Sequence, residues 1–347
     1  MVFSYYIKKY PYKAMWRLSR LFGNPPKISA YIAMPMDYIV LKPVLKHFPD
    51  MHYIAKNSET LEYLKSEGID NVSKYGYPDV VIMCRHSTYR FPEEKIIKIG
   101  FRHGAYHFKA FVSADDYNTF DLYFMTSEKE VAIAKELGIV SAVSGGFPKL
   151  DPAFDGTMND KYLLPYREKA KLNPNKRTII FCTTWDGSGM SAIEKWAEKL
   201  DELTSQYNIV VTLHPWVSQK YYKLIENNPE VYLINENDVL PYLMIADIMV
   251  GDISSIIAEF CALDKPIITF KVQAGKRIVP EIVEIISDIS IQINEFSELN
   301  EAIEHSLNNP VEKSPARQAA NKIMFDTLDG KSGERAAQVI KEFIDRK

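Results

Sequence analysis

Cysteine is scarce in this sequence and forms no pattern. Cys84, Cys182 and Cys261 lie in apolar segments far apart in a chain of 347 residues. They have neither the close, even spacing of a disulfide-stapled domain nor the paired spacing of a zinc site. We therefore expect free thiols and a cytoplasmic location.

Long apolar runs and an excess of either charge are also missing. No apolar stretch reaches the ~18 residues that a membrane-spanning helix needs, and we expect no signal peptide because the N-terminus has no continuous apolar core. The formal net charge of −3 gives no reason to expect a nucleic-acid partner. With 46% hydrophobic and 25% charged residues, the composition is that of a soluble globular protein long enough for two domains.

Several common catalytic motifs are absent as well. The sequence has no GxxxxGK[ST] phosphate loop and no early GxGxxG after a strand. It also lacks the GxSxG nucleophile elbow and the HExxH metal motif. A phosphate site would have to rest on helix ends, hydroxyl groups and histidines, so we expect no metal and no cofactor.

Residues 1–27 contain no acidic residue and differ in this from the rest of the chain. Basic residues alternate there with aromatic and aliphatic ones, and residues 14–22 are predicted to be helical, after an interruption at Pro11. Such a segment favours an anionic membrane surface. The alternative is a surface helix that packs on the first domain with its lysines extended into solvent. The basic residues are Lys8, Lys9, Lys13, Arg17, Arg20 and Lys27.

From residue 28 onward, strand-like and helix-like segments alternate, which predicts a parallel sheet between helices. Residues 155–175 are polar and contain Gly156, Pro165 and Pro174, and the alternation then starts again. We therefore expect an α/β protein with two Rossmann-like domains, 28–160 and 161–347. The expected strands are 28–34, 52–55, 80–84, 96–100, 122–126, 139–144, 178–182, 209–213, 231–234, 248–250, 267–270 and 289–293. The expected helices are 37–48, 58–67, 128–137, 193–205, 219–227, 238–246, 256–263, 297–308, 316–326 and 334–346.

The stretch 246–270 contains the most informative turn. A short apolar strand leads through Gly251-Asp252-Ile253-Ser254-Ser255 into a helix. Asp252, Ser254 and Ser255 are suitable N-cap residues, and a helix start with nearby hydroxyl groups can hold a phosphate. An ordinary βαβ crossover, in which these residues only cap the helix, explains the turn from this stretch alone equally well.

Other polar residues follow strands in the same way. Ligands of open α/β sheets bind at the carboxyl ends of the strands, so this recurrence indicates a site. His103, with an unperturbed pKa near ~6.5, could accept a proton from a hydroxyl group, and Gly104 allows a close approach. His214 could hydrogen-bond a phosphate. Either histidine could instead be structural. The segments are Arg102-His103-Gly104, Gly145 to Asp151, Thr183-Thr184-Trp185-Asp186 and His214-Pro215-Trp216.

Together these motifs resemble the CDP-glycerol glycerophosphotransferases of the teichoic acid and capsule pathways. That family has an HG motif, a GxPRxD motif, a PTWR-like loop, an HP pair, and a DYSS segment followed by KPI. The same order occurs between residues 95 and 335, where Asp329-Gly330-Lys331-Ser332 resembles the family's DG-containing tail. The matching segments are His103-Gly104, Gly146 to Asp151, Thr183 to Asp186, His214-Pro215, Asp252 to Ser255 and Lys265-Pro266-Ile267.

The resemblance implies a GT-B fold, with two Rossmann-like domains facing a central cleft and the nucleotide held mainly by the second. It implies transfer of a polyol phosphate from a CDP-activated donor to a hydroxyl of a lipid-linked glycan, with release of CMP, by an enzyme peripheral on the inner face of a bacterial membrane. His103 would be the base and His214 would contact the donor phosphates. The further site residues are Thr183, Thr184, Asp252, Ser254, Ser255 and Glu259 for the donor, and Gly104, Lys149 and Asp151 for the acceptor or the cleft.

The chain departs from the family pattern at several positions. Asp186 and Lys149 stand where arginines are expected, Ile253 replaces a tyrosine, and Ala105-Tyr106-His107 follows the HG pair. Lysine and aspartate cannot reproduce a bidentate arginine contact to phosphate. The donor therefore stays open among CDP-glycerol, CDP-ribitol, another CDP-polyol and a nucleotide sugar. A nucleotide-sugar glycosyltransferase and a non-catalytic glycan-binding scaffold are the alternative functions.

Overall fold

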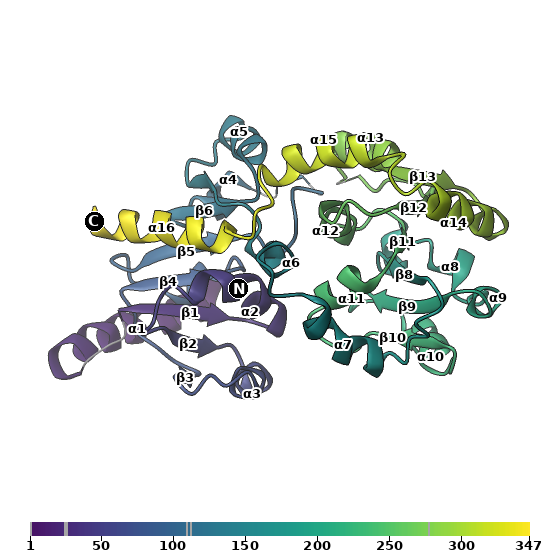
Figure 1. The fold of residues 1–347 in the computed structure, drawn as a ribbon. Helices are drawn as coiled ribbons and strands as arrows, with labels where there is room; N and C mark the ends of the chain where they lie inside the picture. The colour runs from purple at the N-terminus through teal and green to yellow at the C-terminus, as the bar shows by residue number, and fades with distance from the viewer. Residues whose placement is uncertain (1, 24–26, 109, 112, 277) are drawn as a thin grey trace. The chain divides into compact units, whose positions relative to one another are not determined.

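A computed structural model describes residues 2–23, 27–108, 110–111, 113–276 and 278–347. The chain forms two compact units, each built on one sheet (Figure 1). Unit 1 comprises Met1–His103, Phe111–Asp151 and Asp329–Lys347. Unit 2 comprises Gly104–Ala110 and Pro152–Leu328.

Unit 1 contains a seven-stranded parallel sheet in the order β3-β2-β1-β4-β5-β6-β7. The strands are β1 (Ile28–Ile32), β2 (His52–Ala55), β3 (Val72–Ser73), β4 (Val80–Met83), β5 (Ile97–Phe101), β6 (Leu122–Met125) and β7 (Ala142–Ser144). The helices of unit 1 are α1 (Val2–Phe22), α2 (Pro35–Leu45), α3 (Ser58–Ser66), α4 (Ala114–Tyr117), α5 (Glu128–Glu136) and α16 (Ser332–Asp345), and α6 (Asp151–Phe154) crosses the boundary into unit 2.

Burial on both faces explains why the central strands of unit 1 have continuous apolar sequences. All four residues of β4 are buried, and Val81 and Met83 share a core with Tyr31 and Met125. Strand β4 pairs with β1, which is not its neighbour in sequence, so the sheet reverses its winding there. The predicted alternation is confirmed, although β3, α4 and α6 were not expected.

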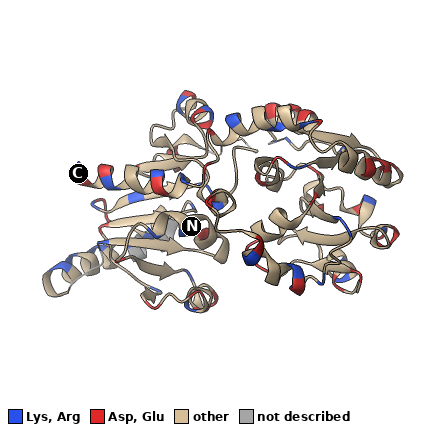
Figure 2. Cartoon of the chain, viewed as in Figure 1, with Lys and Arg blue, Asp and Glu red and all other residues tan. Residues whose placement is uncertain are grey.

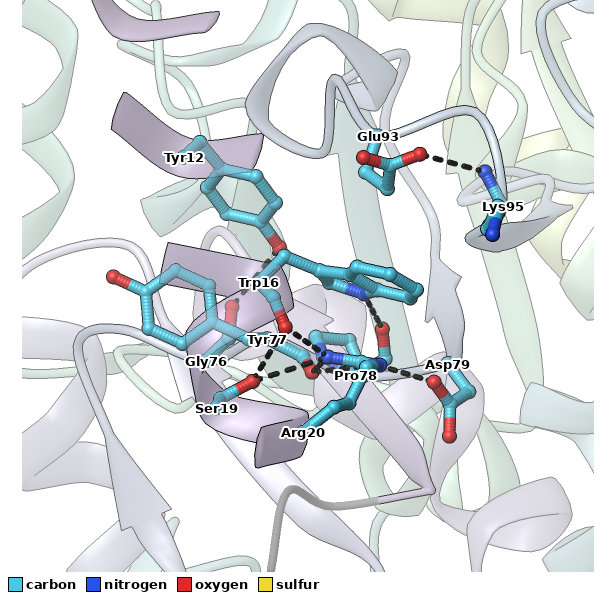
Figure 3. A network of polar contacts seen from close by, with 10 residues as sticks. All are labelled: Tyr12, Trp16, Ser19, Arg20, Gly76, Tyr77, Pro78, Asp79, Glu93 and Lys95. Carbon is cyan, nitrogen blue, oxygen red and sulfur yellow. Dashed lines mark hydrogen bonds and ion pairs between the residues drawn. The ribbon is translucent and has the colours of Figure 1, made fainter. Parts of the chain in front are cut away.

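Helix α1 is longer than expected and packs on unit 1 through one face (Figure 3). Pro11 lies within the helix instead of interrupting its start. The indole of Trp16 donates to Pro78 O at 2.9 Å, and the guanidinium of Arg20 lies over that indole and pairs with Asp79. Tyr12 Oη donates to Gly76 O at 3.0 Å. This is the packing expected of a surface helix; Met1 and residues 24–26 of the predicted membrane segment lie outside the described residues.

Unit 2 contains a six-stranded parallel sheet in the order β10-β9-β8-β11-β12-β13. The strands are β8 (Thr178–Thr183), β9 (Asn208–Leu213), β10 (Val231–Leu233), β11 (Ile248–Gly251), β12 (Ile267–Phe270) and β13 (Ser290–Ile293). The helices are α7 (Asp160–Lys169), α8 (Ile193–Trp196), α9 (Asp201–Thr204), α10 (Gln219–Glu226), α11 (Leu240–Ile245), α12 (Ile256–Ala262), α13 (Pro280–Ile289), α14 (Leu299–Asn308) and α15 (Ser314–Phe325).

The helices of unit 2 differ from expectation in three places. The single helix expected over 193–205 is divided into α8 and α9, and no single contact accounts for the interruption. Helix α13 was not expected, although four of its isoleucines are buried. The helix expected over 297–308 begins at Leu299, because residues 296–298 form a short 3-10 helix whose capping box is formed by Glu295 and Glu298.

The units divide between Asp151 and Pro152 instead of at residue 160, and residues 329–347 return to unit 1. Asp151 accepts hydrogen bonds from Ser332 N and Gly333 N, at 3.0 and 2.6 Å, and so holds the start of α16. A Cβ at Gly333 would overlap the carbonyl oxygen of Pro43 in α2, so glycine allows α16 to approach α2 closely. These contacts explain why residues 329–347 belong to unit 1, although the sequence predicted that they are part of the second domain, 161–347.

Acidic and basic residues are interspersed over most helices of both units (Figure 2), whereas α1 carries basic residues only. Among the described residues, no helix is both long and apolar enough to cross a membrane.

Candidate functional site

Three neighbouring strands of unit 2 present the predicted donor residues at their carboxyl ends. Strand β8 ends at Thr183, β9 is followed by His214, and β11 is followed by Asp252. The strands adjoin in the order β9-β8-β11, and β8 pairs with β11 across the point where the winding reverses. Parallel sheets bind ligands at such a point, so the predicted residues are gathered where a ligand is expected.

Asp252 joins these loops from a wholly buried position. Its carboxylate accepts hydrogen bonds from Thr183 Oγ1 (2.8 Å), Thr184 Oγ1 (2.9 Å), Thr184 N (2.9 and 3.1 Å) and Ala192 N (3.0 Å). Burial raises its pKa, and these donors oppose the shift. The interpretation of Asp252 as an N-cap is wrong: Ser255 occupies the N-cap position of α12, without a side-chain capping bond. Asp252 instead fixes the shape of the turn.

The two serines of this turn carry hydroxyl groups that are only partly covered by protein, since Ser254 and Ser255 are half-buried. Gly104 belongs to unit 2, and a Cβ built on it would lie 3.7 Å from Ser255 Oγ. The glycine of the HG pair therefore lies beside the serines that we expect to hold phosphate.

His214 has a defined tautomer when neutral. Its Nδ1 accepts a hydrogen bond from Trp216 N at 3.1 Å. The neutral ring must then carry its proton on Nε2, because only one ring nitrogen can accept. A half-buried imidazole with a proton on Nε2 can donate to a phosphate oxygen, as expected for His214.

His103 is the last residue of the first segment of unit 1, two positions after β5. Solvent reaches its ring, but the surrounding protein lowers its pKa to about 4, chiefly by desolvation, with additional repulsion from Arg85 and Arg102. Both cations are held by carboxylates: Arg85 Nε lies 2.9 Å from Asp37 Oδ1, and Arg102 Nη1 lies 3.1 Å from Glu130 Oε1. His103 is consequently neutral throughout the physiological pH range.

The other predicted site residues are buried. Lys149 and Asp151 lie in unit 1, where Asp151 holds the start of α16. Glu259 lies in the middle of α12. The side chains of Lys149, Asp151 and Glu259 are all enclosed by protein. Their contacts with the acceptor or the donor therefore stay predictions.

Some contacts at the site were not anticipated. Asp186, which stands where the family pattern has arginine, accepts a hydrogen bond from Ser218 N at 2.8 Å and so ties the loop after β8 to the loop after β9. Ile253 is buried, and nothing in the structure explains its presence in place of tyrosine. No group of three or more His, Cys, Asp or Glu side chains that could hold a metal ion occurs within the described ranges.

The segment after the HG pair is also held within unit 2. Tyr106 Oη donates to Glu281 Oε2 at 3.3 Å, and His107 Nε2 lies 3.9 Å from the same oxygen. Tyr106 has a positive φ of 49°, a conformation that bulky residues seldom adopt. The side chain of His107 is itself buried.

Comparison with curated proteins gives partial matches. The chain is 24% identical over 137 residues to a teichoic acid poly(glycerol phosphate) polymerase of Bacillus spizizenii, an alignment covering 37% of the chain and 34% of that protein. It is 27% identical over 169 residues to a teichoic acid glycerol-phosphate primase of the same organism, covering 46% and 43%. A match to the ribitol-phosphate polymerase TarL of Staphylococcus aureus, at 25% identity, covers 46% and 30%. The chain therefore matches less than half the length of each of these relatives.

Solved structures match over almost the whole chain and confirm the GT-B fold. The wall teichoic acid polymerase TagF, as the H444N variant soaked with CDPG, has a TM-score of 0.68 at 15% identity and covers 99% of this chain and 98% of that one. S. aureus MnaA with UDP has a TM-score of 0.64 at 14% identity, covering 92% and 97%.

The family comparison covers the part of the chain that carries the motifs. The model of the CDP-glycerol:poly(glycerophosphate) glycerophosphotransferases matches residues 100–342, well over half of the sequence. This range includes the HG pair, both loops tied by Asp186, and the turn held by Asp252. The chain belongs to the family of CDP-glycerol:poly(glycerophosphate) glycerophosphotransferases.

Proposed function

We propose that this protein transfers a polyol phosphate, glycerol phosphate first among the candidates, from a CDP-activated donor to a hydroxyl group of a lipid-linked cell-surface glycan, releasing CMP. Family membership supports the reaction class. The observation that carries the proposal for this chain is the gathering of Ser254, Ser255 and His214 at the carboxyl ends of β11 and β9, the two strands that flank β8. The names of the curated relatives agree with a role in wall-polymer synthesis.

His103 serves as the general base in this reaction. A neutral imidazole accepts the proton of the acceptor hydroxyl as its oxygen attacks the β-phosphorus of the donor. The bond between the β-phosphorus and the bridging oxygen breaks, and that oxygen leaves as part of CMP. A pKa of about 4 ensures that the base is unprotonated, although it makes the imidazole a weaker proton acceptor.

Ser254, Ser255 and His214 hold the donor phosphates. The serine hydroxyls can donate to phosphate oxygens, and Nε2 of neutral His214 donates where charge develops on the leaving CMP. Asp252 acts indirectly, because its acceptor oxygens are already occupied by Thr183, Thr184 and Ala192. Positioning and electrostatic stabilisation supply most of the rate in such phosphoryl transfers.

A donor panel tests this reaction. Purified protein is incubated with CDP-glycerol, CDP-ribitol and common nucleotide sugars in the presence of acceptor-bearing membranes, and the released nucleotide is identified. CMP released from a CDP-polyol supports the proposal, and UDP or GDP released from a nucleotide sugar supports the glycosyltransferase alternative. Nucleotide binding with no turnover of any donor supports the scaffold alternative. His103→Ala should abolish turnover, whereas His305→Ala, which removes a partly exposed histidine of α14, should not.

Helix α1 brings the protein to the anionic inner face of the cell membrane in this proposal, as a peripheral cytoplasmic enzyme. While Trp16 faces unit 1, the opposite face exposes Tyr10 (71%), Leu21 (73%) and Phe22 (85%), beside the exposed Arg17. Aromatic and aliphatic side chains flanked by cations suit the interface of an anionic bilayer.

Liposome sedimentation tests this contact without removing the helix. Wild type should bind phosphatidylglycerol vesicles and not phosphatidylcholine vesicles. Leu21→Glu with Phe22→Glu should release it, whereas Val140→Glu, at an 80% exposed position elsewhere in unit 1, should not. Equal binding by both variants would contradict the role of α1.

A further inference from the structure

Two tryptophan rings meet at the carboxyl edge of the unit 2 sheet. Trp185 follows β8 and Trp216 follows β9, and their ring centroids lie 5.8 Å apart at an interplanar angle of 86°. Trp185 is half-buried, whereas Trp216 is 70% exposed. A large aromatic ring exposed to this extent beside a proposed ligand site is a candidate contact for the ligand.

Hydrogen bonds of the backbone and contacts of the ring both hold Trp216 and its loop in place. Its N–H donates to His214 Nδ1, and the imidazole and indole centroids lie 5.4 Å apart. Two residues further on, Ser218 N donates to Asp186 Oδ1. Trp185 packs against the ring in a T-shaped arrangement, so part of the conformational cost of ordering the Trp216 side chain is met before a ligand binds.

Trp185 is itself fixed by the residue two positions later. A Cβ on Gly187 would overlap the indole of Trp185, so the chain doubles back closely against this ring. The two loops thus form one structure in which Trp185 is the support and Trp216 presents its ring to solvent.

The position of Trp216 indicates which part of a nucleotide it contacts. Strand β9 lies two strands from β11, a separation of ~10 Å at the usual strand spacing. Ser254 and Ser255, the proposed phosphate ligands, follow β11, and His214 lies beside Trp216. A nucleoside diphosphate is long enough to reach from the serines, past His214, to the indole with its base.

We propose that Trp216 is the platform on which the pyrimidine base of the donor stacks, with Trp185 as its support. This inference rests on the proposed function, since it takes the donor to be a cytidine nucleotide. Every base has a π-face, so stacking contributes affinity without selecting the base. Replacing Trp216 should therefore raise the Kd and the KM for the donor and change kcat little.

Titration calorimetry with CMP and with inorganic pyrophosphate tests the platform. Trp216→Ala should weaken CMP binding by roughly tenfold, within the ~5- to ~150-fold range of one lost base stack. Trp216→Phe should restore most of the affinity, because phenylalanine also offers a ring. Pyrophosphate has no base, so its affinity should not change in either variant.

Fluorescence gives a second readout that loss of folding would not imitate. Trp16 and Trp196 are buried, so quenching by CMP should come from Trp185 and Trp216 and should fall sharply in Trp216→Phe. If wild type binds CMP and Trp216→Ala binds it equally well, the platform is refuted while the proposed function stands. A rise in the KM for the acceptor alone in Trp216→Ala would likewise refute the platform and leave the proposed function standing. If wild type binds neither CMP nor CDP-glycerol, the proposed function fails and this inference fails with it.

Discussion

Replacing Asp252 by alanine or asparagine separates two roles for this carboxylate. Alanine removes every acceptor, leaving the buried backbone N–H groups of Thr184 and Ala192 without partners. Thr183 Oγ1 also lies 2.9 Å from Thr184 O, and Thr184 Oγ1 lies 2.8 Å from Ile253 O, so both hydroxyls keep an acceptor. Two unsatisfied donors at ~1–3 kcal/mol each predict that Asp252→Ala loses ~2–6 kcal/mol.

Asparagine should be far less harmful. With its amide oxygen at the Oδ2 position, it still accepts from Thr183 Oγ1 (2.8 Å), Thr184 N (3.1 Å) and Ala192 N (3.0 Å), and its NH₂ group can donate to Thr184 Oγ1. The NH₂ group also faces Thr184 N at 2.9 Å, donor against donor, and the charge-assisted bonds are weakened, but Thr184 N keeps its bond to the amide oxygen and no charge has to be buried, so we expect a loss of ~1–2 kcal/mol.

Urea denaturation followed by tryptophan fluorescence measures both variants. Trp185, Trp196 and Trp216 all lie in unit 2, so the signal reports mainly on the unit that contains Asp252. If Asp252→Ala unfolds at the same urea concentration as Asp252→Asn, the carboxylate does not hold these loops together. If Asp252→Asn keeps its stability but loses all donor binding, Asp252 contacts the donor directly.

Three further predictions concern packing and protonation. Gly333→Ala forces a methyl group against the carbonyl oxygen of Pro43, at a cost of ~1–3 kcal/mol; an unchanged melting temperature would contradict this packing. Because the pKa of His103 is lowered to about 4 and a base works above its pKa, kcat/KM should show its acid limb there, and a limb near ~6.5 would contradict the lowered pKa. Burial lowers the pKa of Lys265 to about 8, against ~10.5 in the unfolded chain. Between these two pH values, Lys265 therefore binds a proton more often in the unfolded chain than in the folded protein. Wild type should therefore gain stability relative to Lys265→Met as pH rises through this window, and parallel stability curves would argue against burial of the cation.

Short apolar runs between turn residues were predicted most accurately. The expected strands 52–55 and 267–270 coincide with β2 and β12, because β-branched and aromatic runs bounded by polar or proline-containing turns favour strands locally. Helix α13 was missed although Ile282, Ile285, Ile286 and Ile289 recur at helical spacing; its many β-branched residues obscure that period.

Contacts between distant parts of the sequence could not be predicted from local patterns. Asp252 resembles an N-cap in its own turn, but its partners lie 60 to 69 positions away. Likewise Asp151 binds the start of α16, 181 positions away, so a local pattern around either segment could not predict that the chain returns to unit 1. The ordered set of strand-end motifs indicated the family, but the tie between Asp186 and Ser218 needed the structure.

The fate of the β-phosphorus tests the central proposal most directly. CDP-glycerol labelled with ³²P at the phosphate next to glycerol is incubated with the protein and acceptor-bearing membranes, and label is counted in polymer and in nucleotide. Transfer of glycerol phosphate predicts labelled polymer and unlabelled CMP, with both lost in His103→Ala. Label retained in CDP while unlabelled glycerol enters the polymer would show cleavage on the other side of that phosphate and would contradict the mechanism.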